Sequence, residues 1–252
     1  VPTKKAMNMM WENILTCARC TDDPVKAWEE HNADLNRRFS YLNSLNLDYL
    51  HYESSNGTNF KVWMNPKCQW LGGIEVCTGS GIKFNPNLPS EEVFTSPLAG
   101  KAEGIVFSTK PLSYQGEVIE NFSVRFENGR AVEVKAEKGQ NLLEEMIKMD
   151  NGACMLGEVA LVPYDSPINK TGLLFFNTLY DENAACHLAL GHGFTTTVYG
   201  CENMTQEEMY KMGVNDSNIH VDFMIGSKDL SITGYTRDGK KVQIFRNGTW
   251  AF

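Results

Sequence analysis

The sequence predicts an α+β fold, with two N-terminal helices followed by a mixed, largely antiparallel, curved β domain with inserted helices. Up to about residue 45, apolar residues recur at spacings of three and four, which is typical of amphipathic helices. From residue 47 onwards, short alternating or β-branched segments are separated by Gly, Asn and Pro, which is typical of strands. Asn-Gly or Asp-Gly pairs, which favour tight hairpins, occur at residues 128–129, 238–239 and 247–248.

Two helices are expected at the start of the chain. Over residues 4–20, the Met, Trp, Ile and Leu side chains follow a helical spacing and share one face. The Thr-Asp-Asp-Pro sequence at residues 21–24 combines a capping side chain with a proline suited to a first turn. A second helix is therefore expected over residues 24–45, with its charged face in solvent.

The remaining elements are expected to be short. Helices are predicted over residues 139–148, 181–190 and 205–212. Strands are predicted over residues 157–162, 172–176, 220–225, 231–236, 242–245 and 249–252. Because no repeat, low-complexity tract or linker interrupts the chain, we expect a single domain over residues 1–252.

The composition restricts the classes of function. The 252 residues are 42% hydrophobic and 21% charged, which suits a globular chain with a large core rather than a disordered one. A net charge of −8 without a block of Lys or Arg argues against nucleic acid and anionic membranes as partners. No apolar run approaches the roughly 18 residues needed to span a bilayer, so no membrane insertion is expected.

The cysteines and the first residues bear on compartment and processing. Seven scattered cysteines make a poor disulfide framework for a chain of this size, which favours a reducing compartment. We interpret Cys17 and Cys20 as helix packing rather than as a zinc or redox pair. The sequence begins Val1-Pro2, without Met or a signal segment, so we expect it to be part of something longer.

The histidines differ in their surroundings. His31 lies in a charged helical segment and His51 in an alternating strand, so both are expected to be structural. His220 and Asp222 lie two residues apart in a predicted strand, so their side chains point to the same face. This arrangement suits a metal site or an acid–base pair, and a structural His–Asp hydrogen bond is the alternative.

A second histidine segment lies earlier in the chain. His187 is followed by small and apolar residues on a predicted helix, and Glu182 precedes it by five positions. A histidine on an apolar helix is more often part of the core than a ligand. His192 stands five residues after His187, which departs from the i+3 or i+4 spacing of helical ligands, so it is the weaker candidate.

Acidic residues complete the candidates. Glu158 interrupts an apolar, strand-like run, where burial of a carboxylate requires compensation by a base or a cation. An outward-facing Glu is the alternative. Glu91 and Glu92 follow a proline-rich turn and precede apolar residues, with an exposed turn as the alternative. Mixed His and carboxylate ligands suit zinc, cobalt or manganese, and two such ions would activate a water for hydrolysis.

The motifs resemble a known family. The stretch GEVALVPYDSPINKTGLLFFNTLYDENAACHLALG, at residues 157–191, closely resembles the signature region of the thermophilic metallo-aminopeptidases of the aminopeptidase S and aminopeptidase T type. The segments NPNLPSEEVFTSP, AMNMMWENI, DDPVKAWEEH and IHVDFMIGS fit the same family in the same order. The resemblance covers essentially the whole chain. It implies the carboxy-terminal catalytic domain of the family, without the amino-terminal α/β domain that full members carry.

The resemblance implies a function and a set of site residues. Family members are cytoplasmic exopeptidases that use two divalent metal ions to remove amino-terminal residues from peptides, and a homodimer is a possible assembly. The implied metal ligands are Glu92, Glu158, His187, His220 and Asp222, with Glu158 as the natural bridging carboxylate and Glu182 as a further possible ligand. Glu91 is the candidate general base by analogy only. Neighbouring residues in a strand point to opposite faces, so Glu91 can serve only if the backbone is irregular.

One position departs from the family pattern. Family members carry Tyr after the HLALG motif at the position where this chain has Phe194, so the aromatic ring is retained and the hydroxyl is lost. If that hydroxyl stabilises the tetrahedral intermediate, His192 or Tyr199 must replace it or the activity is reduced. Phe194 and His192 are therefore the candidate substrate-binding residues.

Two other functions compete with an aminopeptidase. Phe194 and the missing amino-terminal segment favour a metal-binding fragment or pseudoenzyme with little or no peptidase activity. A dinuclear phosphoesterase would need Arg side chains or Gly-rich anion donors, and none stands near these motifs.

Overall fold

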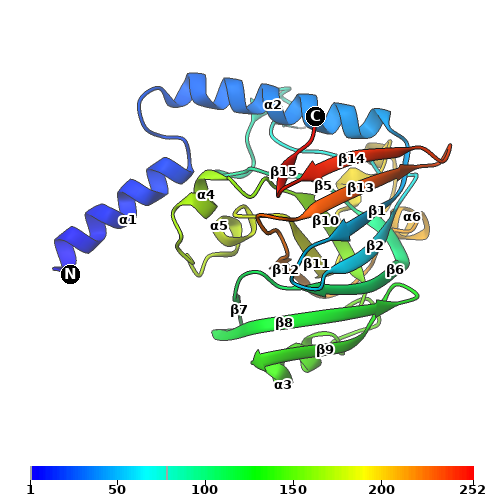
Figure 1. The fold of residues 1–252 in the computed structure, drawn as a ribbon. Helices are drawn as coiled ribbons and strands as arrows, with labels where there is room; N and C mark the ends of the chain where they lie inside the picture. Colours follow the sequence, from blue (N-terminus) through cyan, green and yellow to red (C-terminus); the bar gives the residue numbers. More distant parts are fainter. Residues whose placement is uncertain (1, 78) are drawn as a thin grey trace.

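The computed structural model describes residues 2–77 and 79–252. Two antiparallel sheets form most of the molecule. Helix α2 runs along one edge of the molecule, and helix α1 extends outward from there (Figure 1). The α+β class and the two N-terminal helices are therefore confirmed. None of the helices in the described part of the chain is long and apolar enough to cross a membrane.

The two N-terminal helices differ in how they contact the rest of the chain. Helix α1 (Thr3–Cys17) projects away from the sheets, and its only buried residue is Cys17 (Figure 1). The side chain of Asp23 accepts a hydrogen bond from the Lys26 N–H and starts α2 (Pro24–Ser44), as predicted. Helix α2 buries Leu35 and Leu42 in the main core.

The larger sheet has nine strands in the order β15-β14-β13-β1-β2-β6-β8-β7, with β9 paired to β8. Its strands are β1 (Leu47–Glu53), β2 (Asn59–Met64), β6 (Pro97–Phe107), β7 (Leu112–Tyr114), β8 (Glu117–Glu127), β9 (Arg130–Lys138), β13 (Ser231–Thr236), β14 (Lys241–Arg246) and β15 (Thr249–Trp250). All three predicted hairpins are present in it. Asn128 and Gly129 have φ values of +50° and +76°, the left-handed conformation that tight hairpin turns require.

The smaller sheet has four antiparallel strands in the order β12-β11-β10-β5. They are β5 (Val93–Thr95), β10 (Leu156–Leu161), β11 (His187–Gly191) and β12 (His220–Met224). A separate two-stranded hairpin consists of β3 (Glu75–Val76) and β4 (Lys83–Phe84).

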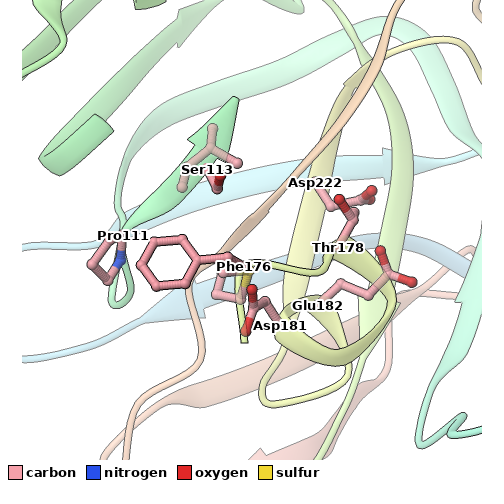
Figure 2. A pocket seen from close by; sticks show the side chains of 9 residues that line it. Pro111, Ser113, Phe176, Thr178, Asp181, Glu182 and Asp222 are labelled. Carbon is pink, nitrogen blue, oxygen red and sulfur yellow. The ribbon is translucent and has the colours of Figure 1, made fainter. Parts of the chain in front are cut away.

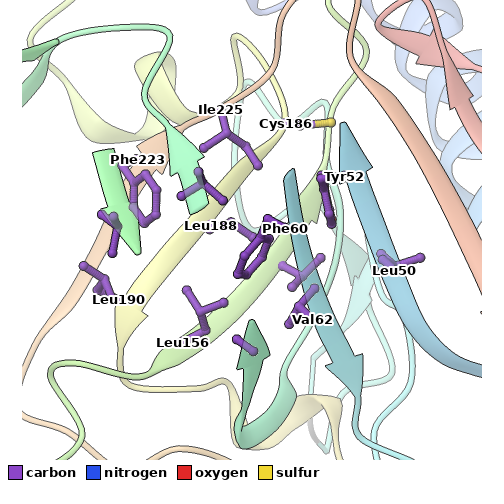
Figure 3. Close-up of a cluster of buried hydrophobic side chains, with 14 of the residues drawn as sticks. Leu50, Tyr52, Phe60, Val62, Leu156, Cys186, Leu188, Leu190, Phe223 and Ile225 are labelled. Carbon is purple, nitrogen blue, oxygen red and sulfur yellow. The ribbon is translucent and has the colours of Figure 1, made fainter. Parts of the chain in front are cut away.

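The main hydrophobic core lies between the two sheets. Figure 3 shows side chains of β1 and β2 meeting side chains of β10, β11 and β12. Phe122 of the larger sheet and Phe223 of the smaller one are both buried, with ring centroids 5.8 Å apart. The smaller sheet therefore uses one face for the core, and its other face is available for a functional site.

The shorter helices lie in the connections between strands. They are α3 (Gln140–Met146), α4 (Pro167–Lys170), α5 (Thr178–Glu182), α6 (Gln206–Lys211) and the 3-10 turns Thr195–Thr197 and Cys201–Asn203. The helices predicted over residues 139–148 and 205–212 are confirmed. The second begins with a capping box between Thr205 and Glu208.

The helix predicted over residues 181–190 is wrong. Helix α5 ends at Glu182, and the chain then enters strand β11 at His187. Local sequence favours a helix because Ala and Leu are good helix formers. Pairing on both sides, with β10 and β12, overrides that preference.

The strand predicted over residues 172–176 is also wrong. The segment is an irregular connection between α4 and α5, and Phe176 is 63% exposed. The carboxylate of Asp181 accepts hydrogen bonds from the N–H groups of Phe175 and Asn177. These bonds satisfy the backbone without a partner strand.

Candidate metal centre

The candidate centre lies on the face of the smaller sheet that points away from the core. Along β11, Leu188 and Leu190 enter the core, so His187 and Ala189 point to the opposite face. Along β12, Val221 and Phe223 enter the core, so His220 and Asp222 share that outer face. The prediction that His220 and Asp222 point the same way is confirmed.

Cross-strand register brings the acidic residues into one row. Glu158 on β10 is paired with Ala189 on β11, and Ala189 is paired with Asp222 on β12. Directly paired residues share a face of the sheet. His220 is paired with Gly191, so residues with small or no side chains separate the larger polar ones. This alternation leaves space above the sheet into which the polar side chains converge.

The five predicted ligands come together in two overlapping groups. One consists of Glu92, Glu158 and His187, the other of Glu158, His220 and Asp222, and in each group the ligand atoms lie within 4.8 Å of one another. His187 Nε2 lies 3.1 Å from a Glu92 carboxylate oxygen. His220 Nε2 lies 3.3 Å from an oxygen of Glu158 and 3.3 Å from one of Asp222. Glu158 belongs to both groups.

The two imidazoles are oriented as metal ligands commonly are. His187 Nδ1 lies 3.1 Å from the Ala185 carbonyl, and His220 Nδ1 lies 2.7 Å from the His192 carbonyl. Donation of Nδ1–H to a backbone carbonyl directs Nε2 into a site. Within the described residues, His187 Nε2 and Asp222 Oδ1 are buried atoms that, despite these short contacts with oppositely charged groups, make no hydrogen bond of good geometry. These residues therefore fit a divalent metal ion.

The electrostatics indicate an excess of negative charge. Burial raises the pKa of Glu158, and the neighbouring carboxylates of Glu92 and Asp222 raise it further. Burial alone would lower the pKa of His187, but the Glu92 carboxylate 3.1 Å away, aided by Glu158 and Asp222, raises it to about 10. Burial also opposes protonation of His220, yet Asp222 and Glu158 raise its pKa to about 11. The cluster therefore attracts positive charge, from protons or from metal ions.

Glu182 lies beside this cluster but belongs to neither ligand group. Figure 2 shows Glu182 of α5 and Asp222 of β12 bordering the same small cavity. Glu182 also lines a larger cavity of about 320 Å³ together with Glu92, Glu158 and His220. Burial, together with repulsion by Asp222 and Glu92, raises the pKa of Glu182 to about 9.

Glu91 and Glu92 are directed to opposite sides of the chain. Glu92 faces His187, whereas both carboxylate oxygens of Glu91 lie 2.6 Å from the guanidinium of Arg19. The structure therefore does not bring Glu91 into the cluster. Its role as the general base stays a prediction, and the contact with Arg19 favours a different role.

Ser90 and Glu91, which precede Glu92, are held in place by contacts that no sequence motif indicated. The Asn183 side chain accepts a hydrogen bond from the Glu91 N–H at 2.6 Å, and His31 Nε2 lies 2.7 Å from the Ser90 carbonyl. The third contact is the ion pair between Glu91 and Arg19, whose backbone φ is +55°. His31 is thus structural, as predicted. The contacts of Arg19 and Asn183 are long-range, and no local pattern in the sequence indicates them.

The two predicted substrate-binding residues are placed differently. Phe194 lines the larger cavity, and its ring centroid lies 4.8 Å from that of His220. The ring of His192 lies 5.9 Å from that of Tyr210, and the backbone carbonyl of His192 is what contacts His220. The position of Phe194 fits contact with a substrate, whereas His192 contributes through its backbone.

The fold and site can be compared with known proteins. A sequence profile described as thermophilic metalloprotease matches residues 1–250. The chain belongs to this family. The resemblance to the metallo-aminopeptidases that the sequence indicated is confirmed.

Relatives within the family carry aminopeptidase names. The chain is 48% identical to aminopeptidase AmpS of Bacillus subtilis and 47% identical to aminopeptidase 2 of Geobacillus stearothermophilus, each over 250 residues. It matches the structure of wild-type AmpT from Thermus thermophilus with a TM-score of 0.92 and 42% identity, over 100% of this chain and 60% of that chain. The two sequence matches cover 99% of this chain and 60% of each relative. The chain therefore spans about 60% of the length of the curated relatives it matches.

Proposed function

We propose that the chain is the metal-binding catalytic domain, over residues 1–252, of a metal-dependent aminopeptidase that hydrolyses amino-terminal residues from peptides. The observation that carries the proposal is the sharing of Glu158 by two ligand groups at a cavity wall. Divalent ions held by these groups would supply an acidified water and polarise the scissile carbonyl. Glu92 and His187 would hold one ion, and His220 and Asp222 the other.

The cavity also suits the free amino terminus of a peptide. Five carboxylates line it, from Glu75, Glu92, Glu158, Glu182 and Asp222. No Lys or Arg is found among the described residues of its lining. Such a surface favours a cationic ammonium group over a blocked or anionic end.

Proton transfer needs a carboxylate at the cavity that is not committed to a metal. Glu182 meets this condition, because it lines the cavity and belongs to neither ligand group. Its raised pKa shows that its environment favours the protonated form when no cation neutralises the neighbouring carboxylates. We assign it the transfer of a proton from water to the leaving amine, in preference to Glu91, which is bound to Arg19.

The proposal extends to compartment and assembly. Peptides in the cytoplasm are the proposed substrates, since Cys17, Cys154 and Cys186 are thiols that form no disulfide, which is typical of proteins in a reducing compartment. A homodimer is the proposed assembly, on the family resemblance alone.

Hydrolysis of simple substrates tests the proposal. The protein loaded with zinc, cobalt or manganese should release the amine from leucine and arginine aminoacyl amides. N-acetylated leucine amide, which lacks the ammonium group, is the matched control and should not be cleaved. Absence of turnover with all three metals would contradict the enzymatic function.

Phe194 favours a second candidate, a metal-binding domain with little or no peptidase activity. The ring beside His220 lacks the hydroxyl that the family pattern places there. Under this alternative the protein binds metal but turns over slowly, and Phe194→Tyr raises the turnover number at least tenfold while metal affinity stays the same. An unchanged turnover number in that variant would contradict a role for the missing hydroxyl.

A further inference from the structure

Strand β10 is irregular at Gly157, directly before the carboxylate that both ligand groups share. Leu156 pairs with Leu190 and Glu158 pairs with Ala189, so two steps along β10 correspond to one step along β11. Gly157 is therefore the extra residue of a β-bulge. Bulges are frequent beside active sites, where they redirect a side chain.

The bulge decides on which face of the sheet Glu158 lies. In a regular strand, residues two positions apart share a face, so Glu158 would point the same way as Leu156. Instead Leu156 and Val159, which are three positions apart, both enter the core, and Glu158 joins the ligand groups on the opposite face. The extra residue at Gly157 thus allows β10 to bury its apolar side chains and still present Glu158 to the centre.

The absence of a side chain at Gly157 also makes room for the turn that follows β11. A Cβ at this position would lie 2.1 Å from the carbonyl oxygen of His192 and 2.4 Å from that of Gly191, far inside van der Waals contact. Both oxygens belong to the backbone, so no side-chain rotation could relieve the clash. Gly193 approaches from the other side, and a Cβ there would lie 3.1 Å from the carbonyl oxygen of Gly157. The bulge and the turn therefore fit together only because glycines meet.

The carbonyl that Gly157 accommodates is the one that orients His220. His220 Nδ1–H donates a hydrogen bond of 2.7 Å to the carbonyl oxygen of His192. Nε2 of the same ring lies 3.3 Å from an oxygen of Glu158 and 3.3 Å from one of Asp222. Displacement of the His192 carbonyl would therefore turn Nε2 away from both carboxylates.

The two imidazoles of the centre differ in how firmly their surroundings hold them. The His187 side chain is 1% exposed, and Ala185, whose carbonyl it contacts through Nδ1, lies two positions before it. The His220 side chain is 24% exposed, and its Nδ1 partner, His192, lies 28 positions away. The orientation of His220 thus depends on a contact between separate segments, and Gly157 leaves the space for that contact.

We propose that Gly157 is a positioning residue of the candidate metal centre, and that it sets two ligands at once, Glu158 through the bulge and His220 through the His192 carbonyl. The inference rests on the proposed metal-dependent function. Because both contacts need a position without a side chain, a single methyl group at Gly157 should weaken metal binding while all five ligands remain. If Gly157 served close packing alone, the same methyl group would lower stability and leave metal affinity unchanged.

A closely packed glycine on the larger sheet provides the control. A Cβ at Gly234 of β13 would lie 2.8 Å from a methyl group of Leu47, so Gly234→Ala also disturbs buried packing, away from the ligands. Competition with a metal-binding dye measures zinc affinity, which should fall at least about tenfold in Gly157→Ala and change less than about twofold in Gly234→Ala. Urea denaturation of both variants shows how much stability each has lost. Equal zinc affinity in Gly157→Ala and the wild type would overturn the inference.

The Nδ1–H group of His220 provides a second measurement, by NMR of the metal-free protein. Its hydrogen bond to His192 should slow exchange with water, so the wild type should show its resonance. That resonance, assigned by its absence in His220→Gln, should disappear in Gly157→Ala and persist in Gly234→Ala. Persistence in Gly157→Ala would contradict the role through His192. If the wild type binds no zinc but Gly157→Ala loses the resonance, the proposed function fails while the positioning role stands.

A milder variant, Gly193→Ala, decides the question if Gly157→Ala does not fold. A Cβ at Gly193 would lie 2.8 Å from a methyl group of Val214, the same distance as in the Gly234 control, so this variant should fold. It would also press on the Gly157 carbonyl and move the turn away from the bulge. Zinc affinity should fall about threefold to tenfold, and the His220 resonance should weaken. No change in either measurement would overturn the inference.

Discussion

The two sheets are built from the same antiparallel pairing, yet they place ionisable side chains in opposite environments. On the larger sheet, Glu120 pairs with Lys138 and Glu133 with Arg125, and all four side chains are between 38% and 61% exposed. On the smaller sheet, Glu92, Glu158 and Asp222 are only 3–7% exposed. In the described part of the chain, the ion-pair partners of these three carboxylates are histidines rather than Lys or Arg.

The two sheets therefore use charged side chains for different purposes. An exposed ion pair is screened by water, so it keeps the surface soluble and adds little to stability. A buried group of carboxylates without a permanent cation is costly to fold, and it is retained where it binds something. The contrast between the sheets can be tested by removing comparable groups from each.

The largest effect is expected at Glu158. Glu158→Gln removes the carboxylate common to both ligand groups, so metal affinity should fall at least about 100-fold, beyond the range for loss of an outer-shell partner. Competition with a metal-binding dye measures this, and circular dichroism shows whether the fold is retained. Glu120→Gln on the larger sheet is the matched control and should bind metal as the wild type does. Equal affinities in the two variants would remove Glu158 from the site.

Arg19 should have the next largest effect. Arg19→Ala leaves the buried Glu91 carboxylate without its cation, which should lower the free energy of unfolding by about 3 kcal/mol. Because Glu91 precedes Glu92, metal affinity should also fall about tenfold. Urea denaturation and dye competition measure the two quantities. In the double variant Arg19→Ala, Glu91→Ala, much of the lost stability should return. If the double variant is as unstable as Arg19→Ala, the pairing is not what Arg19 contributes.

Glu182, beside the candidate metal centre, and Glu133, on the larger sheet, should make stability respond to pH with opposite signs. The pKa of Glu182 is raised to about 9 by burial and by Asp222 and Glu92, so its contribution to the stability of the metal-free protein is fully present below pH 4.5, where the carboxyl is protonated in both states. That contribution is lost as the pH rises from 4.5 through about 9. The pKa of Glu133 is lowered to about 2 by hydrogen bonds to Lys135 and Arg125, so its contribution is present above pH 4.5 and lost as the pH falls through about 2.

Unfolding measured between pH 5 and 9 tests these signs. Stability of the metal-free wild type should decrease over this range, and Glu182→Gln should reduce the decrease by at least about 1.4 kcal/mol, the equivalent of one pKa unit. Glu133→Gln should leave the slope over the same range unchanged. A steeper decrease in Glu182→Gln than in the wild type would mean that the raised pKa has the wrong sign.

The smallest effect is expected at the exposed pair on the larger sheet. Lys138→Ala removes the partner of Glu120, 2.7 Å away, but water replaces the interaction. The free energy of unfolding should change by less than about 1 kcal/mol. Urea denaturation of Lys138→Ala and Arg19→Ala in parallel measures this quantity. A larger loss of unfolding free energy in Lys138→Ala would mean that exposure does not account for the difference between the sheets.

Local patterns in the sequence predicted the features that depend on neighbours in the chain. The helix start at Asp23 and the hairpin at Asn128 each rest on a few adjacent residues, and both are present. The shared face of His220 and Asp222 follows from strand periodicity alone. The strand at His187 was missed because its pairing partners lie in distant segments, and those partners override the helical preference of the local sequence.

The sequence predicted which residues form the candidate site, but not which residues surround them and hold them in place. Resemblance to the family supplied Glu92, Glu158 and His187 as ligands, and the structure brings them together. Glu91 and Glu92 precede strand β5 and are directed to opposite sides of the chain. The contact that Glu91 makes with Arg19 joins residues 72 positions apart, and nothing in either local sequence indicates it.

Ala189 contributes to the centre by having almost no side chain. It stands between Glu158 and Asp222 in the cross-strand row, on the face where the candidate ligands converge. Any larger residue there would fill the space that the ligands surround, while every ligand remained in place. A relative that keeps all five ligands but carries valine or leucine at the matching position would look competent in a comparison of ligands alone. Classification of active and inactive family members should therefore include this position.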